Sequence, residues 1–169
     1  MAVPSGTTIR LARANDEQAL SALDAQAWSP RSGFPSVIEA GREAGVAFFS
    51  ADSPPHSHLV AESGGVVVGY VRLKPASPLP ENAHVMYIAG IAVDEPARKQ
   101  GAATRLLEAA ERYATDRGCR KLSLRVLGTN EPAIRLYERL GFVREGTLRD
   151  EFLINGAFVD DVIMARYLA

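Results

Sequence analysis

The stretch that decides the fold is residues 84–107, which read HVMYIAGIAVDEPARKQGAATRLL. Its first ten residues alternate with apolar side chains on both faces: Val85, Tyr87, Ala89, Ile91 and Val93 on one, and Met86, Ile88 and Ala92 on the other. A strand that is apolar on both faces is central in its sheet and covered on both sides. Gly90 inside it indicates a bulge or a close approach of another backbone.

A turn from Asp94 to Gln100 leads through Gly101 into a helix that we expect to end at Gly118. The apolar positions of this helix recur at helical spacing: Ala103, Leu106, Leu107, Ala110, Tyr113 and Ala114. A helix that begins at a glycine turn after a strand presents unpaired N–H groups and a positive dipole end, which bind phosphate. Arg98 and Lys99 add positive charge that we expect to be mobile. The turn has neither the Gly-Lys-Ser/Thr ending of a Walker loop nor the Gly-x-Gly-x-x-Gly of a dinucleotide fold.

Further strands and helices flank this unit on both sides. The other strand patterns are Thr8–Ala12, His58–Ser63, Val66–Leu73, the alternation Leu122, Leu124 and Val126, and the final pair Phe142–Ile154 and Ala157–Leu168. Gly64-Gly65 and Asn155-Gly156 are two-residue hairpin turns. Helices are predicted after Asn15 or Asp16, over Ser36 to Ala44, and after Asn130, where Ala133, Leu136, Tyr137 and Leu140 form the buried face. The order predicts an α/β domain with a mixed sheet between helices.

Length and composition limit the kind of protein. The 169 residues indicate a single domain over 1–169, with 47% hydrophobic and 23% charged residues. The net charge of −1 gives no general attraction to nucleic acid or anionic lipid. Cys119 is the only cysteine, which excludes an internal disulfide and indicates a reducing compartment. No apolar run approaches the ~18 residues of a membrane span, so we expect a cytoplasmic protein without a nucleic-acid or membrane partner.

A second motif adds a family resemblance. Residues 130–142 read NEPAIRLYERLGF, which resembles the Asn-x-x-Ala-x-x-Leu-Tyr-x-x-x-Gly-Phe signature of the GNAT-type N-acetyltransferases. Upstream, Arg98 to Ala103 resembles the Gln/Arg-x-x-Gly-x-Gly/Ala pyrophosphate loop of that family. The closing hairpin is similar to the branch that includes polyamine, amino-acid and ribosomal-protein acetyltransferases.

The resemblance implies a GNAT-type fold, a mostly antiparallel sheet of about seven strands whose central pair is bulged and splayed. It also implies acetyl-CoA as cofactor and transfer to a primary amine by direct attack in a ternary complex. Tyr137 would place its hydroxyl beside the thioester sulfur, where charge develops. The implied cofactor contacts are the main chain of Ile91, Ala92 and Val93, the amides of Arg98, Lys99, Gln100, Gly101, Ala102, Ala103 and Thr104, and the side of the next helix at Asn130, Ala133 and Tyr137.

The general base is left unassigned. Similar enzymes often place Glu or His on the central strand near Tyr87 and Ala89, and an alanine cannot serve. Tyr87 or His84 could act directly or order a water, or simply pack. Trp28 and Phe34 could wall the acceptor pocket or form a satellite core cluster.

The remaining sequence features give weaker functional predictions. His56 and His58 lack a third ligand, so no metal site is expected; Cys119 is interpreted as core. The final hairpin has more acids than bases, which favours a cationic amine or simply a solvated face. A non-catalytic acyl-CoA sensor, transfer of a different acyl group, and a homodimer remain open alternatives.

Overall fold

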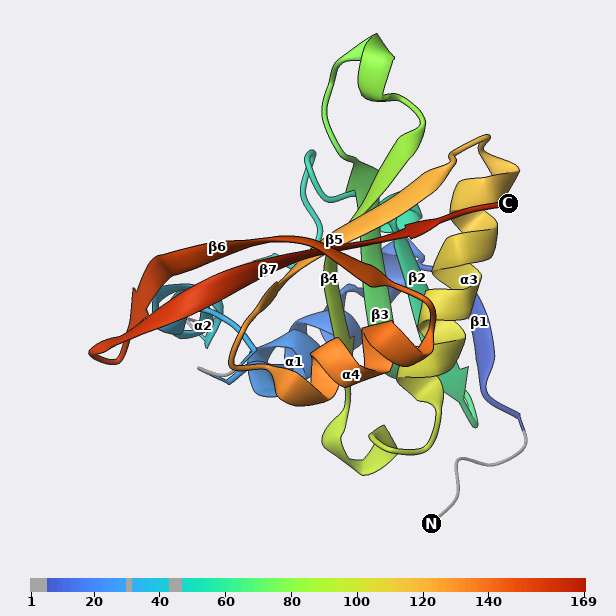
Figure 1. Cartoon of the computed structure of the whole chain (residues 1–169). Helices are drawn as coiled ribbons and strands as arrows, with labels where there is room; N and C mark the ends of the chain where they lie inside the picture. The colour runs from blue at the N-terminus through green and yellow to red at the C-terminus, as the bar shows by residue number, and fades with distance from the viewer. Residues whose placement is uncertain (1–5, 30–31, 43–46) are drawn as a thin grey trace.

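The computed structural model describes residues 6–29, 32–42 and 47–169, and a seven-stranded sheet forms their centre (Figure 1). The spatial order is β1-β2-β3-β4-β5-β7-β6, and every neighbouring pair is antiparallel except β4 and β5. The strands are β1 (Thr8–Leu11), β2 (His58–Ser63), β3 (Val66–Pro75), β4 (Val85–Val93), β5 (Lys121–Leu127), β6 (Val143–Ile154) and β7 (Ala157–Tyr167). The predicted mixed, mostly antiparallel sheet between helices is confirmed.

Helices cover both faces of this sheet. They are α1 (Glu17–Ala27), α2 (Pro35–Arg42), α3 (Ala102–Asp116) and α4 (Glu131–Arg139), with short 3-10 turns η1 (Ala14–Asp16), η2 (Pro55–Ser57), η3 (Pro80–Asn82) and η4 (Glu95–Ala97). In Figure 1 the long β6–β7 ribbon projects past the other strands toward α2. Among the described residues no helix is both long and apolar enough to span a bilayer.

The two larger apolar cores lie on opposite faces of the sheet. On one face, Leu106 and Leu107 of α3 pack with Val71 and Ile88 of the sheet. On the other face, the buried α1 residues Leu20 and Leu23 pack with a smaller set of sheet residues, Val60, Tyr70 and Ala92. Because each helix buries one stripe, the sheet is held between α3 and α1.

β4 contains a bulge at Ala89. Its neighbours Gly90 and Ile88 pair with the consecutive β3 residues Arg72 and Leu73, so Ala89 has no partner across the ladder. The extra residue reverses the alternation of side chains. Before it, Met86 and Ile88 face α3; after it, the α3 face holds Ile91 and Val93, while Ala92 joins the α1 core.

The predicted faces of this strand are therefore wrong beyond Ala89, because a strict period of two does not survive a bulge. The bulge itself was predicted at Gly90, one residue later than observed. Gly90 has no positive φ. A side-chain carbon there would lie 3.9 Å from Cζ2 of Trp28 and 4.0 Å from the Tyr70 hydroxyl, which are ordinary contact distances, so no close approach of another backbone requires the glycine.

The parallel pair β4 and β5 is splayed, as predicted. The two strands pair only from Val85–Ile88 against Lys121–Leu124. Beyond Ile88, the edge of β4 that faces β5 has no ladder partner there. Backbone groups left without a ladder are available to a bound molecule.

Several local predictions are confirmed and a few shift. Both hairpin turns have the expected left-handed residues: Gly64 and Gly65, and Asn155 and Gly156. The predicted loop after Leu73 begins later, because β3 runs to Pro75. The α2 prediction extends to residues 43–44, outside the described residues. On α4, Ile134 and Tyr137 are buried, whereas the predicted Ala133, Leu136 and Leu140 are half-buried.

Helix α1 begins directly after Asp16, as expected, but the Asp16 side chain does not cap it. Asp16 precedes the helix, but its carboxylate accepts hydrogen bonds from Arg10 at 2.8 Å and from the Arg13 amide at 2.7 Å instead of capping α1. The guanidinium of Arg10 holds the pKa of Asp16 below its usual value. This pair ties β1 to α1.

Candidate functional site

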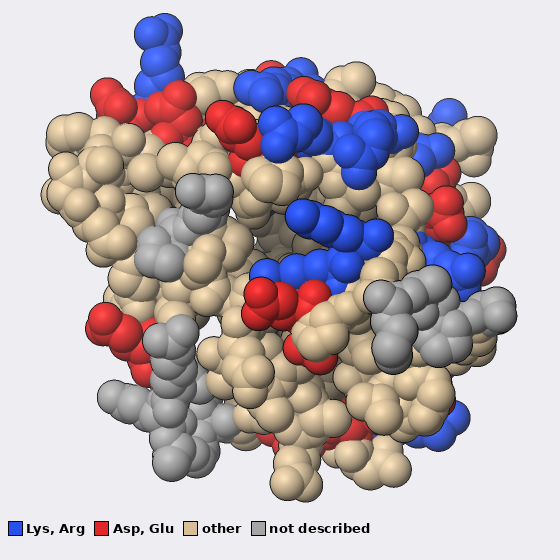
Figure 2. Space-filling view, turned by 90° about the horizontal axis from the view of Figure 1, so that it is seen from below, with Lys and Arg blue, Asp and Glu red and all other residues tan. Residues whose placement is uncertain are grey.

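A cavity of about 790 Å³ lies where β4 and β5 part. Its walls are the end of α1, the segment before and within α2, β4 from Tyr87 to Val93, β5 from Leu124 to Leu127, the inner side of α4, and single residues of β6 and β7, Phe152 and Asp161. Figure 2 shows a hollow on the underside of the molecule with Lys and Arg side chains beside it. The volume is within the range of small-molecule sites.

Tyr137 reaches this cavity from α4. Its side chain lines the wall, the residue is 6% exposed, and its ring packs 5.7 Å from that of Phe142. Burial, and then the neighbouring Tyr87, raise the pKa of the Tyr137 hydroxyl. None of the described residues forms a hydrogen bond with this hydroxyl. Tyr137 is thus a protonated donor in an apolar wall.

The turn before α3 presents a row of free amides. The backbone N–H groups from Lys99 to Thr104 donate to no acceptor within the described part of the chain. Lys99 and Gly101 have left-handed φ angles of 61° and 87°, and such residues occur in the anion-binding nests formed by successive amides. Nothing lies within 4 Å of the point where a Gly101 side chain would begin. This cradle of amides and the α3 N-terminus suit the pyrophosphate of coenzyme A.

Arg98 connects the cradle to the cavity. Its Nε donates to the Val93 carbonyl at 3.0 Å, and a terminal nitrogen donates to the Ala27 carbonyl at 3.2 Å. The prediction of a mobile Arg98 side chain is therefore wrong. The bond from Arg98 Nε engages the carbonyl of Val93, one of the three β4 residues expected to contact the cofactor, so Ile91 is the better candidate to hold the pantetheine arm.

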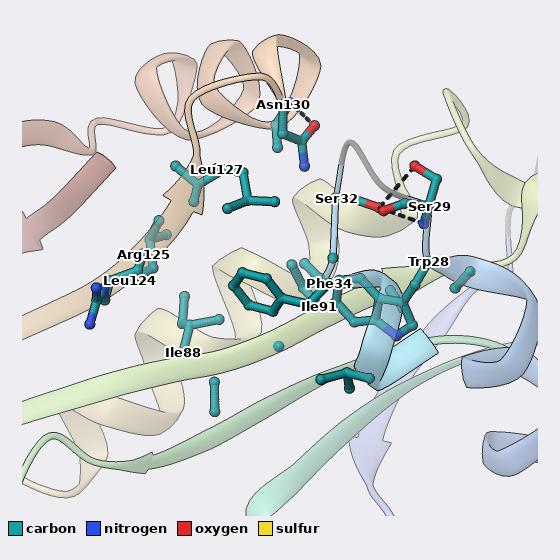
Figure 3. A pocket seen from close by; sticks show the side chains of 18 of the residues that line it. Trp28, Ser29, Ser32, Phe34, Ile88, Ile91, Leu124, Arg125, Leu127 and Asn130 are labelled. Carbon is teal, nitrogen blue, oxygen red and sulfur yellow. Dashed lines mark hydrogen bonds between the residues drawn. The ribbon is translucent and has the colours of Figure 1, made fainter. Parts of the chain in front are cut away.

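The remaining predicted cofactor residues are divided between the cavity and the cradle. Ile91, Ala92, Val93, Arg98, Asn130, Ala133 and Tyr137 line the cavity. Lys99, Gln100, Gly101, Ala102, Ala103 and Thr104 lie outside its lining, in the cradle. The side chain of Asn130 accepts from the Ala133 amide at 3.4 Å, as a helix cap should, and extends toward the cavity (Figure 3).

The α1 side of the cavity has its own group of side chains. Asp24, in α1, accepts hydrogen bonds at Oδ1 from the Tyr70 hydroxyl at 2.5 Å and from the Trp28 indole at 2.6 Å. Burial is the main cause that raises the pKa of Tyr70. Trp28 is half-buried and lies on the wall next to Phe34 in Figure 3.

A second charged group faces the same space from β5 and β7. Arg125 Nε donates to Asp161 Oδ2 at 2.5 Å, and Asp161 is only 3% exposed. The guanidinium also lies 3.9 Å from Glu151. Tyr87 is half-buried here, and burial raises the pKa of its hydroxyl. Arg125 lowers this pKa and Asp161 raises it. Sequence reasoning missed Asp24, Arg125 and Asp161 as site residues, because no short motif surrounds them.

The other histidine and cysteine candidates lie elsewhere. His84, named with Tyr87 as an alternative base, precedes β4 and is not among the cavity-lining residues. His58 is 1% exposed, its Nδ1 lies 3.0 Å from the Pro54 carbonyl, and burial lowers its pKa. Cys119 is buried. Among the described residues no cluster of three metal-ligating side chains occurs.

Comparisons with known proteins agree with this geometry. The model of the acetyltransferase (GNAT) family matches residues 19–142. The chain is 36% identical over 117 residues to the L-amino acid N-acetyltransferase AaaT of Escherichia coli, which covers 69% of this chain and 71% of that protein. It is 32% identical over 139 residues to a mycothiol acetyltransferase of Amycolatopsis mediterranei, covering 78% of this chain but 44% of that longer protein.

Solved structures share the fold. A Streptococcus mutans protein superposes with a TM-score of 0.78 at 25% identity, covering 96% of this chain and 99% of the other. The Salmonella typhimurium protein yncA, solved with its cofactor acetyl-CoA, superposes with a TM-score of 0.73 at 22% identity, covering 98% and 95%. At that identity the second likeness concerns the fold alone.

Proposed function

The chain belongs to the GNAT acetyltransferase family, whose cofactor is acetyl-CoA, and we propose that it transfers the acetyl group to a primary amine. The observation that carries this proposal is the opening between β4 and β5, with the free amides of Lys99 to Thr104 near one end and Tyr137 in its wall. The free amides come from the family motif at Arg98 to Ala103, and Tyr137 comes from the family motif at residues 130–142.

The residues present suit acetyl-CoA. The amides of the cradle would hold the pyrophosphate, the β4 edge at Ile91 would hold the pantetheine arm, and Asn130 would contact the cofactor from the start of α4. Bound there, the cofactor supplies an activated thioester. The chain's part is to orient it, to exclude water, and to stabilise charge as it leaves on sulfur.

We propose that Tyr137 is the side chain that interacts with the thioester sulfur of the cofactor. Complete proton transfer from a phenol of ordinary pKa ~10 to a thiolate of pKa ~8.5 has an unfavourable free energy of about 2 kcal/mol. Burial raises the pKa of Tyr137 further, so complete transfer is less favourable still. We therefore propose that its hydroxyl donates a hydrogen bond to the sulfur as charge develops, and that the proton arrives later.

The amine must lose a proton before it attacks. A primary alkylamine of pKa ~10.4 is neutral in about one part in ~2500 at pH 7, which costs about 4.6 kcal/mol. Tyr87 has a raised pKa and stays protonated at neutral pH, so it is suited to ordering a water and not to accepting the proton itself. His84 lies outside the lining, and we assign no general base.

The acceptor is proposed only as a class. One relative is named for L-amino acids and another for mycothiol, and we include amino acids, polyamines and protein N-termini among the candidates. Two alternatives remain: a non-catalytic acyl-CoA sensor on the same fold, and an enzyme that takes another acyl group.

A thiol-release assay with acetyl-CoA and a panel of primary amines tests the proposal, with a melting curve at several cofactor concentrations beside it. Acetyl-CoA should raise the melting temperature by mass action, and at least one amine should release thiol. A shift without release from any amine would favour the sensor. No shift at millimolar acetyl-CoA would contradict both readings.

A further inference from the structure

A carboxylate is held in place at the α1 side of the cavity. Asp24 lies in α1, lines the cavity, and accepts at its Oδ1 the hydroxyl hydrogen of Tyr70 and the indole hydrogen of Trp28. Tyr70 is 5% exposed and belongs to the α1 core. Two donors fixed by packing thus set the position of one carboxylate oxygen.

The second oxygen of Asp24 is not used by the fold. No residue of the described ranges 6–29, 32–42 and 47–169 donates a hydrogen bond to Oδ2. The two donors to Oδ1 lie against β4 beside the bulge: a side-chain carbon at Gly90 would be 3.9 Å from the Trp28 ring and 4.0 Å from the Tyr70 hydroxyl. The carboxylate therefore sits beside the opening in the sheet.

Asp24 also differs from the other acidic residue in the lining. Asp161 is paired with Arg125, whose guanidinium extends to Glu151 as well. Arg98, the other cation of the lining, is bonded to the carbonyls of Val93 and Ala27. Within the described lining, Asp24 has no basic partner, so its negative charge is left to attract a cation from outside the protein.

We propose that Asp24 binds the acceptor in its ammonium form, before the reacting amine loses its proton, and selects acceptors that carry a positive charge. The indole N–H of Trp28 and the hydroxyl of Tyr70 hold one carboxylate oxygen, which leaves the other oxygen for the ammonium. Within the described lining, Arg98 and Arg125 are already bonded, so no free cation is left there for an acceptor carboxylate. This inference rests on the proposed function for the identity of the bound amine as an acceptor, and it names the group by which that amine is recognised.

Asp24→Asn tests it with little change of shape, because the amide oxygen of Asn still accepts from Tyr70 and Trp28. The probes are phenethylamine, cadaverine and L-phenylalanine amide, assayed with acetyl-CoA. We expect the KM of the best of these acceptors to rise about 10- to 100-fold, with kcat within about 3-fold and the acetyl-CoA KM unchanged. Glu39→Gln, which removes an exposed charge on α2 outside the lining, should leave all three values as in the wild type.

A binding experiment on the wild type keeps the inference testable if Asp24→Asn does not fold or if no amine is turned over. Calorimetry in the presence of coenzyme A compares each ammonium probe with its neutral isostere: phenethylamine with 2-phenylethanol, and cadaverine with 1,5-pentanediol. We expect at least one ammonium to bind about 10-fold more tightly than its isostere. Failure of every ammonium to do so, or an unchanged acceptor KM in Asp24→Asn, would overturn the role of Asp24. Absence of thiol release alone would overturn only the proposed reaction.

Discussion

The ring of Phe34 packs edge-on against the ring of Phe152, with centroids 4.6 Å apart and planes at 64°. Phe34 stands just before α2 and Phe152 on β6, so this pair joins two segments that are far apart in the sequence, and both residues line the cavity. Phe34, expected either to wall the pocket or to join a satellite core, thus contacts the hairpin at the cavity wall.

Phe34→Ala should weaken acceptor binding and spare the cofactor. Loss of the pair with Phe152 should lower stability by about 0.5 to 1.5 kcal/mol. Loss of the Phe34 ring from the lining removes apolar contact with the acceptor worth about 1 kcal/mol, so we expect the acceptor KM to rise about 3- to 10-fold with the acetyl-CoA KM unchanged. Phe158→Ala removes a 69% exposed ring of β7 that is not in the lining, and serves as the control. Equal kinetics in the two variants would place the acceptor elsewhere.

Tyr137→Phe removes one hydroxyl and almost no volume, so the packing of α4 should survive. If the hydroxyl bonds the sulfur as charge develops, kcat should fall about 10- to 1000-fold while acetyl-CoA affinity changes little. Steady-state kinetics and a melting curve on the same preparation check this. Turnover at the wild-type rate in the folded variant would show that another donor stabilises the leaving thiolate.

Gly101→Ala and Gly118→Ala form a matched pair. Both glycines flank α3 with left-handed φ angles, 87° and 76°, and nothing lies within 4 Å of a side-chain carbon at either position. An alanine costs about 1 to 2 kcal/mol in that conformation, so both variants should lose similar stability. Only Gly101→Ala should weaken acetyl-CoA binding, by about 10-fold, because its methyl group enters the cradle of amides. Calorimetric titration measures the difference, and equal affinities would move the pyrophosphate away from this turn.

His58 should make the fold sensitive to mild acid. Burial lowers its pKa in the folded state, so the unfolded chain, with a His pKa of about 6.5, binds the proton more readily. The free energy of unfolding should therefore fall as the pH is lowered from 7 through about 6.5 and below. Urea unfolding at pH 7 and pH 5 should show a smaller fall in His58→Gln than in the wild type. His56→Gln, at an exposed position, should keep the wild-type difference; a full fall in both variants would assign the effect to other groups.

The helices, strands and turns of this fold can be predicted from residues that are neighbours in the sequence. The α1 side of the cavity, where Asp24 meets Tyr70, cannot. Gly101, Asn130 and Asn155-Gly156 act on their own neighbours in the chain, so the turns and helix starts they predict are found. Asp24 and Tyr70 meet only through the sheet, and neither is marked by a motif. The bulge at Ala89 depends on which β3 residues pair with β4, and that pairing is set by the whole ladder. The turns and helix starts were therefore predictable from neighbouring residues, while the long-range contacts on the acceptor side were not.

The reversed alternation at Ala89 also decides where substitutions on β4 would act. An experimenter who wishes to broaden or redirect acceptor choice by saturation mutagenesis would, from simple alternation, vary Tyr87 together with Ile91 and Val93. The last two pack against α3, so most such variants would be lost to misfolding. The productive set crosses the bulge and pairs Tyr87 with Gly90, the position that approaches Trp28 and Tyr70. One unpaired residue thus decides which β4 side chains face α3 and which face α1, a division that the printed sequence does not show.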